Sequence, residues 1–217
     1  MSLRDPRLRA PWAGRDRAST GPAREAVLVV CTGNICRSAY AELVLQTRLD
    51  ELAPGRLEVG SAGSRPNQAL TVPEPILALV DDAGREHLGR HRPAQLTRPM
   101  VDDADLVLAA SQEHRAAALR ECPGAMGRTF TVLELAEVIQ RLDERTGGAW
   151  IVPGAGVRAF AAEASRQRGL ARAAGGALDV PDPFGGPEAG YRGMAAVLDP
   201  ALERIAAALA VAATPAS

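Results

Sequence analysis

A cysteine and an arginine six positions apart are the residues of this chain best suited to covalent chemistry on an anion. The segment that they bracket reads Cys31-Thr32-Gly33-Asn34-Ile35-Cys36-Arg37-Ser38. A cysteine thiolate is a strong nucleophile, and the guanidinium of an arginine is a planar fork that binds two phosphate oxygens at once. The pair therefore predicts nucleophilic attack on a phosphoryl group.

The elements expected around this segment would place it well for that chemistry. The apolar run 26–31 is typical of a strand buried on both faces, and residues 38–52 carry apolar side chains at helical spacing. A loop between a strand end and a helix start gathers backbone N–H groups into an anion nest. We expect the positive potential of that nest to hold Cys31 as a thiolate.

A structural interpretation of the same loop is also possible. Cys31 could be a small buried hydrophobe, and Thr32-Gly33-Asn34 an ordinary turn. The preceding strand, the Gly-Asn pair and the serine after the arginine favour the phosphate-binding interpretation.

Composition narrows the class of protein. The chain has 217 residues, of which 47% are hydrophobic and 24% charged, as expected for one globular domain with appendages. A formal charge of −1 offers no general attraction to nucleic acid or to an anionic membrane. All 25 basic residues are arginine, which excludes a Walker-type phosphate loop and a Schiff-base mechanism, since both need lysine.

Three cysteines are too few for a disulfide framework and indicate a reducing compartment. The cysteines and the three histidines lack zinc-site spacing, so no metal is expected. No apolar stretch approaches the roughly 20 residues that span a bilayer, and the N-terminus lacks the apolar core of a secretory signal. A cytoplasmic location is therefore expected.

Strand and helix patterns alternate along the chain. Residues 1–24, with six arginines and three prolines, are predicted to be a disordered basic tail, and residues 25–212 to form the domain. Strands are expected over 26–31, 56–61, 105–109 and 129–132, and helices over 38–52, 73–83, 111–121 and up to 142. Gly84 is expected to close the second helix. This alternation predicts a parallel, doubly wound α/β sheet, which binds ligands at the carboxyl ends of its strands.

The second half of the chain is less regular. Residues 143–177 are rich in Ala, Arg and Gly, contain an amphipathic helix candidate over 157–172, and are interpreted as a surface insertion. Apolar residues then keep helical spacing from 194 to 209 although Asp199-Pro200 interrupts them. This pattern predicts either one kinked helix or two helices.

Phosphoryl transfer also needs an acid that protonates the leaving oxygen. The candidate is Asp182, because two prolines stiffen the loop around it and could aim its carboxyl group. The Asp-Pro pair could equally start a turn. Spacing alone does not select Asp182 over the other carboxylates, which are Asp179, Asp102, Asp103 and Asp105.

The chain resembles the low-molecular-weight protein tyrosine phosphatases. Residues 31–38 resemble the nucleophile loop of that family at every position. Further similar segments are Ser61-Ala62-Gly63, residues 89–96, the strand 104–108 and the acid loop Asp182-Pro183-Phe184-Gly185. The resemblance runs over residues 26–142 and resumes at 180. It implies a four-stranded parallel sheet flanked by helices, with a phosphate-binding loop after the first strand. It also implies no cofactor and no metal, a phosphorylated protein as partner, and hydrolysis through a cysteinyl-phosphate.

The resemblance also implies roles for individual residues. Cys31 would attack phosphorus, and Asp182 would protonate the leaving oxygen and then activate water. Phosphate oxygens would be held by Arg37 within the loop Thr32, Gly33, Asn34, Ile35, Cys36, Arg37 and Ser38.

Other residues would support this loop and its surroundings. Ser38 would hydrogen-bond the Cys31 thiolate. Asn34, in the left-handed conformation that asparagine tolerates, would be held by Ser61 and His91. Phe184 would line the mouth of the site and stack on an aryl ring, and Cys36 would form a reversible disulfide with Cys31 under oxidation.

Departures from the family pattern bear on the substrate. Many members carry aromatic residues where this chain has Ser64-Arg65-Pro66-Asn67 and Gly185, so a more open mouth is expected. Relatives acting on phosphoarginine have a similar acid loop but typically a threonine at the position of Ile35, which favours phosphotyrosine here. The alternatives are phosphoarginine hydrolysis, arsenate reduction, for which only Cys122 remains as a further cysteine, and a non-catalytic phosphoprotein-binding module.

Overall fold

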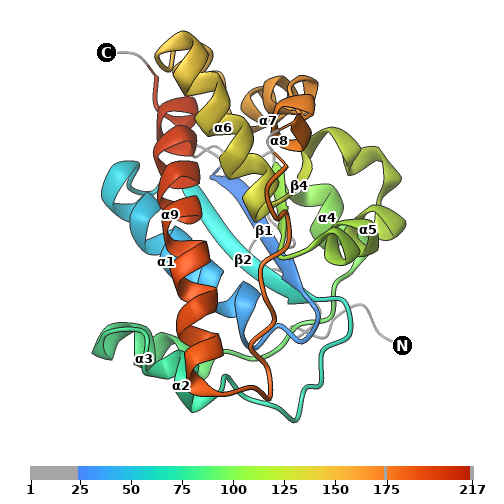
Figure 1. Cartoon of the computed structure of the whole chain (residues 1–217), viewed down its shortest axis with the longest axis vertical. Helices are drawn as coiled ribbons and strands as arrows, with labels where there is room; N and C mark the ends of the chain where they lie inside the picture. Colours follow the sequence, from blue (N-terminus) through green and yellow to red (C-terminus); the bar gives the residue numbers. More distant parts are fainter. Residues whose placement is uncertain (1–23, 174, 216–217) are drawn as a thin grey trace.

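Four parallel strands form the centre of the molecule. The computed structural model describes residues 24–173 and 175–215, so the predicted tail lies outside the described residues except for Arg24. The strands are β1 (Glu25–Cys31), β2 (Leu57–Gly63), β3 (Leu106–Ala109) and β4 (Thr129–Thr131), in the spatial order β2-β1-β3-β4 (Figure 1). The predicted four-stranded parallel sheet is confirmed.

The central position of β1 explains its unbroken apolar sequence. It pairs with β2 on one side and β3 on the other, with Cys31 opposite Gly63 and Val30 opposite Ala109. The chain passes from β1 to β2 on one side and then to β3 on the other. Cys31 therefore ends its strand at a topological switch point, where open α/β sheets bind ligands.

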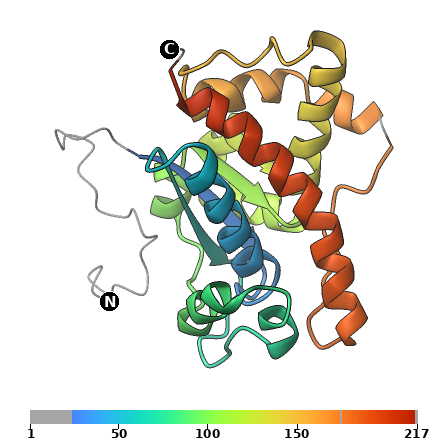
Figure 2. The same ribbon diagram turned by 90° about the vertical axis from the view of Figure 1, so that its left-hand side faces the viewer.

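Helices cover both faces of the sheet. One face carries α1 (Arg37–Leu52), α6 (Val132–Thr146) and α9 (Glu188–Ala213), and the other carries α4 (Arg98–Asp103), α5 (Gln112–Glu121) and the 3-10 helix η2 (Pro123–Arg128) (Figure 1 and Figure 2). A hydrophobic core lies on each face of the sheet, and alternate residues of β1 belong to one or the other. Val27 and Val29 lie in the core on the α1 side, and Leu28 and Val30 in the core on the α5 side. This is the arrangement expected of a strand buried on both faces.

The C-terminal helix α9 is continuous. Pro200 lies inside it, so the chain forms one helix rather than two. Asp199 accepts a hydrogen bond from the Tyr40 hydroxyl of α1 at 2.9 Å. This contact ties α9 to the helix that follows the candidate phosphate loop.

The helix expected over 73–83 is wrong in its bounds. The structure has two helices, α2 (Glu74–Leu77) and α3 (Asp82–Arg90), and Gly84 lies inside α3. Asp81 caps α3 by accepting from the Gly84 backbone N–H at 2.8 Å. A Cβ on residue 84 would lie 2.9 Å from Val80 Cβ and 3.0 Å from Leu43 Cδ2. Gly84 therefore permits close packing and does not end a helix.

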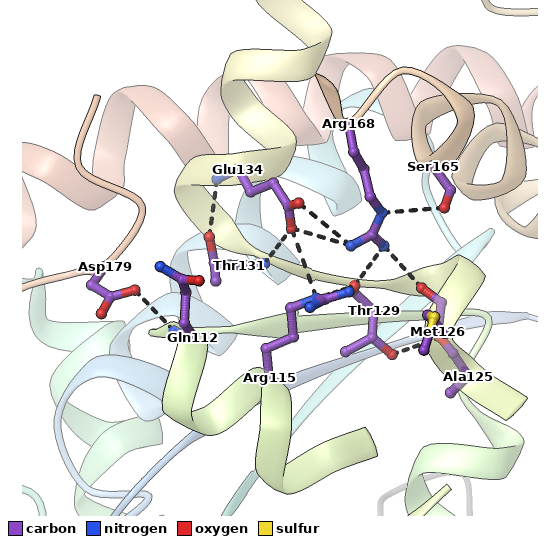
Figure 3. A network of polar contacts seen from close by, with 10 residues as sticks. All are labelled: Gln112, Arg115, Ala125, Met126, Thr129, Thr131, Glu134, Ser165, Arg168 and Asp179. Atoms are coloured by element: carbon purple, nitrogen blue, oxygen red, sulfur yellow. Dashed lines mark hydrogen bonds and ion pairs between the residues drawn. The ribbon is translucent and has the colours of Figure 1, made fainter. Parts of the chain in front are cut away.

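Part of the expected insertion 143–177 packs into the core. It forms α7 (Val157–Arg166) and α8 (Gly169–Ala173), two helices where one was expected. Four side chains of α7 are at most 4% exposed and belong to the core on the α6 face, namely Val157, Phe160, Ala161 and Ala164. Between the two helices, Arg168 donates to the backbone oxygens of Met126 at 2.9 Å and Thr129 at 2.7 Å (Figure 3). The segment is thus packed into the domain.

No helix within residues 24–173 and 175–215 combines the length and the apolar character that crossing a membrane requires.

Candidate active site

The loop after β1 lies between the carboxyl end of a strand and the amino end of α1. Cys31 and Cys36 are buried, with 2% and 4% of their surfaces exposed, and both are free thiols. The first turn of α1 contains no acidic residue, and no described side chain caps it. The partial positive charge of this helix end therefore acts on the loop without an acidic residue in the first turn of α1 to offset it.

Two polar groups lie within hydrogen-bond distance of the sulfur of Cys31. The Asn34 backbone N–H donates to Cys31 Sγ at 3.2 Å, and Ser38 Oγ lies 3.0 Å from the same sulfur. Hydrogen bonds of this kind stabilise a sulfur anion.

Asn34 holds the loop in shape. Its φ of 56° is the one positive value among the described non-glycine residues, and its side chain is fully buried. Its amide nitrogen donates to Ser61 Oγ at 2.6 Å and Ser38 Oγ at 3.0 Å, and its side-chain oxygen accepts from the Ala94 N–H at 2.9 Å. His91 Nε2 lies 2.7 Å from the Asn34 backbone oxygen. Ser61 and His91 thus both contact Asn34.

The end of β2 approaches the loop too closely for a side chain. A Cβ on Gly63 would lie 2.6 Å from the Thr32 backbone oxygen. The next two residues bind the loop through their backbones, Ser64 N–H to the Cys31 oxygen at 2.9 Å and Arg65 N–H to the Thr32 oxygen at 3.0 Å. The end of β2 and the two residues after it therefore contact the loop directly.

Behind Ser61 lies a carboxyl group that the sequence did not single out. Ser61 donates its hydroxyl hydrogen to Glu42 Oε2, and burial raises the pKa of Glu42 to about 7. Glu42 thereby ends a chain of hydrogen bonds that runs through Ser61 to Asn34. No spacing pattern marks it, because it lies within the ordinary periodicity of α1.

The structure brings Asp182 to the phosphate loop across 145 positions of sequence. Asp182 Oδ2 accepts from Arg37 Nη2 at 2.6 Å, and Arg37 Nη1 donates to the Val180 oxygen at 3.4 Å. The Arg37 side chain is only 8% exposed, whereas that of Asp182 is 51% exposed. Among the described residues, buried Arg37 Nε has no hydrogen-bond partner.

Two further predicted site residues lie beside this centre. Phe184 is 56% exposed, and its N–H donates to Asp182 Oδ1 at 3.3 Å, so its ring is presented at the surface next to the acid candidate. Burial raises the pKa of Cys36 to about 12, with a smaller contribution from Cys31. Cys36 is therefore a neutral thiol at neutral pH.

Sequence reasoning missed His114, which touches the loop from the opposite side. Its Nε2 lies 2.7 Å from Thr32 Oγ1 and its Nδ1 lies 2.7 Å from Ser111 Oγ. Desolvation, helped by the positive charge of Arg37, lowers the pKa of His114 to about 4. The ring is neutral at neutral pH. A lone histidine three residues after the helix cap Ser111 carries no spacing signal in the sequence.

The described side chains include no cluster of three or more His, Cys, Asp or Glu that could hold a metal ion. What they do bring together is a sulfur nucleophile, a guanidinium with an unsatisfied donor and a carboxyl group. Such a set can bind an oxyanion, attack it and exchange a proton with a leaving group.

Comparisons with known proteins find relatives of this chain among phosphatases. Low molecular weight protein-tyrosine-phosphatase Etp of Escherichia coli (strain K12) is 38% identical over 107 residues, which span 48% of this chain and 66% of that protein. A protein-arginine-phosphatase of Geobacillus stearothermophilus is 27% identical over 180 residues, 83% of this chain and 93% of its own.

Solved structures share the fold. The YwlE arginine phosphatase from Geobacillus stearothermophilus superposes with a TM-score of 0.56 at 26% identity, covering 84% of this chain and 90% of its own. The tyrosine phosphatase AmsI of Erwinia amylovora superposes with a TM-score of 0.57 at 24% identity, covering 88% and 96%.

The family model described as low molecular weight phosphotyrosine protein phosphatase matches residues 26–145. That segment contains the candidate phosphate loop, the Ser-Ala-Gly segment and, apart from Glu25 at the start of β1, the four strands of the sheet. The chain belongs to the low molecular weight phosphotyrosine protein phosphatase family.

Proposed function

We propose that the protein hydrolyses phosphotyrosine in phosphorylated proteins through a cysteinyl-phosphate formed on Cys31. The observation that carries the proposal is the hydrogen bond from Arg37 to Asp182 at 2.6 Å, which brings the acid candidate to the loop that begins at Cys31. In this proposal Cys31 is the nucleophile, Arg37 the oxyanion ligand and Asp182 the proton donor.

Binding of the phosphoryl group would begin at Arg37. Its Nε is buried without a partner among the described residues, and a phosphate oxygen is an acceptor that would satisfy it. The backbone N–H groups of residues 32–37 and the α1 amino end add positive potential for the equatorial oxygens. A bound phosphate would also compete with Asp182 for the guanidinium and so free that carboxyl group for the leaving oxygen.

The first chemical step forms one bond and breaks one. Cys31 Sγ attacks phosphorus, the bond from phosphorus to the tyrosyl oxygen breaks, and the Asp182 carboxyl proton passes to that oxygen. Ser38 and the Asn34 N–H stabilise the sulfur before and after transfer.

The second step returns the protein to its starting state. Asp182, now a carboxylate, takes a proton from a water molecule whose oxygen attacks phosphorus. The S–P bond breaks, inorganic phosphate leaves, and the sulfur is again an anion. Charge on the phosphoryl oxygens stays neutralised by Arg37 throughout.

Hydrolysis of p-nitrophenyl phosphate tests this mechanism. We expect Cys31→Ser to abolish turnover, and Asp182→Ala to slow it by about 10²–10⁴-fold, the usual contribution of a general acid. Undiminished turnover by Cys31→Ser would reject the mechanism. A phosphopeptide that the wild-type protein binds without releasing phosphate would instead favour a non-catalytic binding module, and thioredoxin-coupled turnover of arsenate would favour the reductase.

Phosphoarginine is the second candidate substrate, because the relative aligned over 83% of this chain bears the name protein-arginine-phosphatase. Apolar Ile35, which is 4% exposed within the loop, supports phosphotyrosine as the main substrate. Phosphate release from matched phosphotyrosine and phosphoarginine peptides separates the two. We expect faster release from phosphotyrosine, and a reversed order would overturn the preference.

Phe184 is proposed to contact the aryl ring of the substrate. Its exposed side chain follows the acid loop directly, and an aromatic ring stacks well on another. Phe184→Ala should raise KM for aryl phosphates and leave KM for small alkyl phosphates unchanged. An equal change for both classes would exclude a stacking role.

Cys36 is proposed to protect Cys31 from irreversible oxidation. Hydrogen peroxide would convert Cys31 to a sulfenic acid with loss of water, and attack by Cys36 sulfur would release a second water and form the disulfide. After peroxide treatment, dithiothreitol should restore the wild type better than Cys36→Ser. Equal recovery of the two would rule this role out.

A further inference from the structure

The amino end of α5 touches both halves of the proposed active site. On one side His114 contacts Thr32 of the phosphate loop at 2.7 Å. On the other side the Gln112 backbone N–H donates to Asp179 Oδ1 at 2.8 Å, and Asp179 precedes the acid candidate by three residues. One short stretch, residues 110–114, thus joins two segments that lie about 150 positions apart in the chain.

The hydrogen bonds of Ser111 indicate which group donates in the contact between His114 and Thr32 of the phosphate loop. Ser111 Oγ accepts from the His114 backbone N–H at 3.4 Å as the cap of α5. Its own hydrogen is then available for His114 Nδ1, which lies 2.7 Å away. In a neutral ring this leaves the hydrogen on Nε2, which can donate to Thr32 Oγ1. A buried donor therefore fixes the first residue after the nucleophile.

The contact with the acid loop has a second point. The Val180 N–H donates to the Ala110 oxygen at 2.8 Å, beyond the end of β3, and the buried Val180 presents its own oxygen to Arg37. Together with the Asp179 contact, this docks the chain just before Pro181. The two prolines that flank Asp182 then limit where its carboxyl group can go.

Helix α5 itself is anchored to the sheet. Arg115 Nε donates to the Thr129 oxygen of β4 at 3.0 Å and lies 3.9 Å from Glu134 Oε2. Figure 3 shows this network together with the Asp179–Gln112 contact and Arg168, which binds the same Thr129 oxygen. Residues that bind α5 are therefore held to the same sheet as Cys31, which is the last residue of β1.

We propose that Asp179 and His114 are positioning residues, which use the amino end of α5 to set Asp182 and the phosphate loop in register. The inference rests on the proposed phosphatase function. Asp179 acts through Asp182, so it governs protonation of the leaving group. His114 acts through Thr32, so it governs how tightly the loop holds an oxyanion.

The two roles predict different kinetic signatures. Protonation matters most for poor leaving groups, so Asp179→Ala should lower kcat/KM for phenyl phosphate about tenfold and change it little for 2,4-dinitrophenyl phosphate. Asp179→Asn keeps an oxygen acceptor for the Gln112 N–H and should retain most of the wild-type rate. Asp179→Ala should add little to Asp182→Ala, because the first residue acts through the second.

The matched control is Asp81→Ala. Asp81 also accepts a backbone N–H at a helix start, in α3, at 2.8 Å. Its loss reproduces the cost of removing a carboxylate from a helix amino end, but it should not steepen the dependence of kcat/KM on the leaving group.

The role of His114 at the phosphate loop is tested by inhibition with orthovanadate, an oxyanion that the loop would bind. We expect His114→Gln and Thr32→Val each to weaken inhibition about tenfold, and the double variant to weaken it no further than either one. Asp179→Ala should leave vanadate inhibition unchanged. Thr32→Val preserves shape, so it serves even if the His114 variant fails to fold.

The outcomes separate the inference from the function on which it rests. Lack of wild-type turnover on every aryl phosphate would reject the phosphatase proposal itself. Two results with an active wild type would overturn the positioning inference alone. One is that the wild type and Asp179→Ala depend equally on the leaving group. The other is that the losses are additive in Asp179→Ala/Asp182→Ala or in His114→Gln/Thr32→Val.

Discussion

At the scale of single residues, Asn34 combines backbone conformation and hydrogen bonding in one position. Its φ of 56° is unfavourable for a residue with a Cβ, and its side chain binds Ser38, Ser61 and the Ala94 N–H. The loop shape therefore depends on local strain that three partners hold in place.

A pair of variants at this position separates the two contributions. Asn34→Gly loses the side-chain hydrogen bonds but keeps easy access to positive φ, whereas Asn34→Ala loses both. We expect both to lower the free energy of unfolding, and the alanine variant to be less stable than the glycine variant by about 1–2 kcal/mol. Urea denaturation measures the difference. Equal stabilities would show that the backbone conformation carries no cost.

Glu42 predicts a pH dependence of stability. Burial raises its pKa from 4.5 to about 7, so the folded state holds a proton that the unfolded state releases. The stabilisation is present below about pH 4.5 and is lost as the pH rises through 7. Glu42→Gln mimics the protonated side chain and still accepts from Ser61.

We expect the effect of Glu42→Gln on the free energy of unfolding to depend on pH. The free energy of unfolding of Glu42→Gln, relative to the wild type, should rise between pH 5 and pH 8. The exposed Glu51→Gln on the same helix serves as control and should show no such rise. A Glu42→Gln effect that is constant over this range would contradict the raised pKa.

At the scale of elements, the packing of α3 on α1 depends on a glycine. A Cβ on Gly84 would lie 3.0 Å from Leu43 Cδ2 of α1 and 2.9 Å from Val80 Cβ, whereas a Cβ on Gly89 of the same helix meets nothing within 4 Å. Intrinsic helix propensity favours alanine at both positions. Packing should reverse that preference at one of them.

We expect Gly84→Ala to destabilise the protein by about 1–3 kcal/mol through overpacking, and Gly89→Ala to stabilise it by up to about 1 kcal/mol. Thermal denaturation of the two variants decides the point. Destabilisation of the same size in both would mean that glycine is needed along α3 for another reason.

The errors and successes of the sequence-based prediction have physical causes at this same scale. Unbroken apolar runs mark β1 and β3 and an alternating pattern marks β2, and all four strands were predicted within two residues of their bounds. Gly84 was misassigned because glycine commonly follows a helix end, although Asp81 three residues earlier is a recognisable N-cap. Asp182 could be chosen only through the family resemblance, because its partner Arg37 is 145 positions away. Nothing in the spacing of His114 indicates its contact with Thr32.

At the scale of the whole molecule, the segment 143–177 is joined to the core by a buried ion pair. Arg168 lies 3.4 Å from Glu134 Oε1, and the two side chains are 13% and 6% exposed. The Arg168 guanidinium also lies 4.0 Å above the ring of Phe130 in β4. Glu134 at the same time completes the capping box of α6 with Thr131, so one carboxylate connects three parts of the fold (Figure 3).

This arrangement predicts that breaking the pair costs more than removing it. Arg168→Met leaves Glu134 buried with only the more distant Arg115, at 3.9 Å, and should lower the free energy of unfolding by about 3–5 kcal/mol. Arg168→Met/Glu134→Gln should recover part of that loss, since the buried carboxylate is then gone and glutamine can still accept the Thr131 N–H. Arg166→Ala, which removes an exposed pair with Glu163, should cost less than about 1 kcal/mol.

Because Arg168 binds the Thr129 oxygen that also receives Arg115 of α5, amide hydrogen exchange in Arg168→Met should accelerate in α7, α8 and α5 together. Faster exchange confined to α7 and α8 would show instead that the segment is energetically separate from the active-site half of the domain.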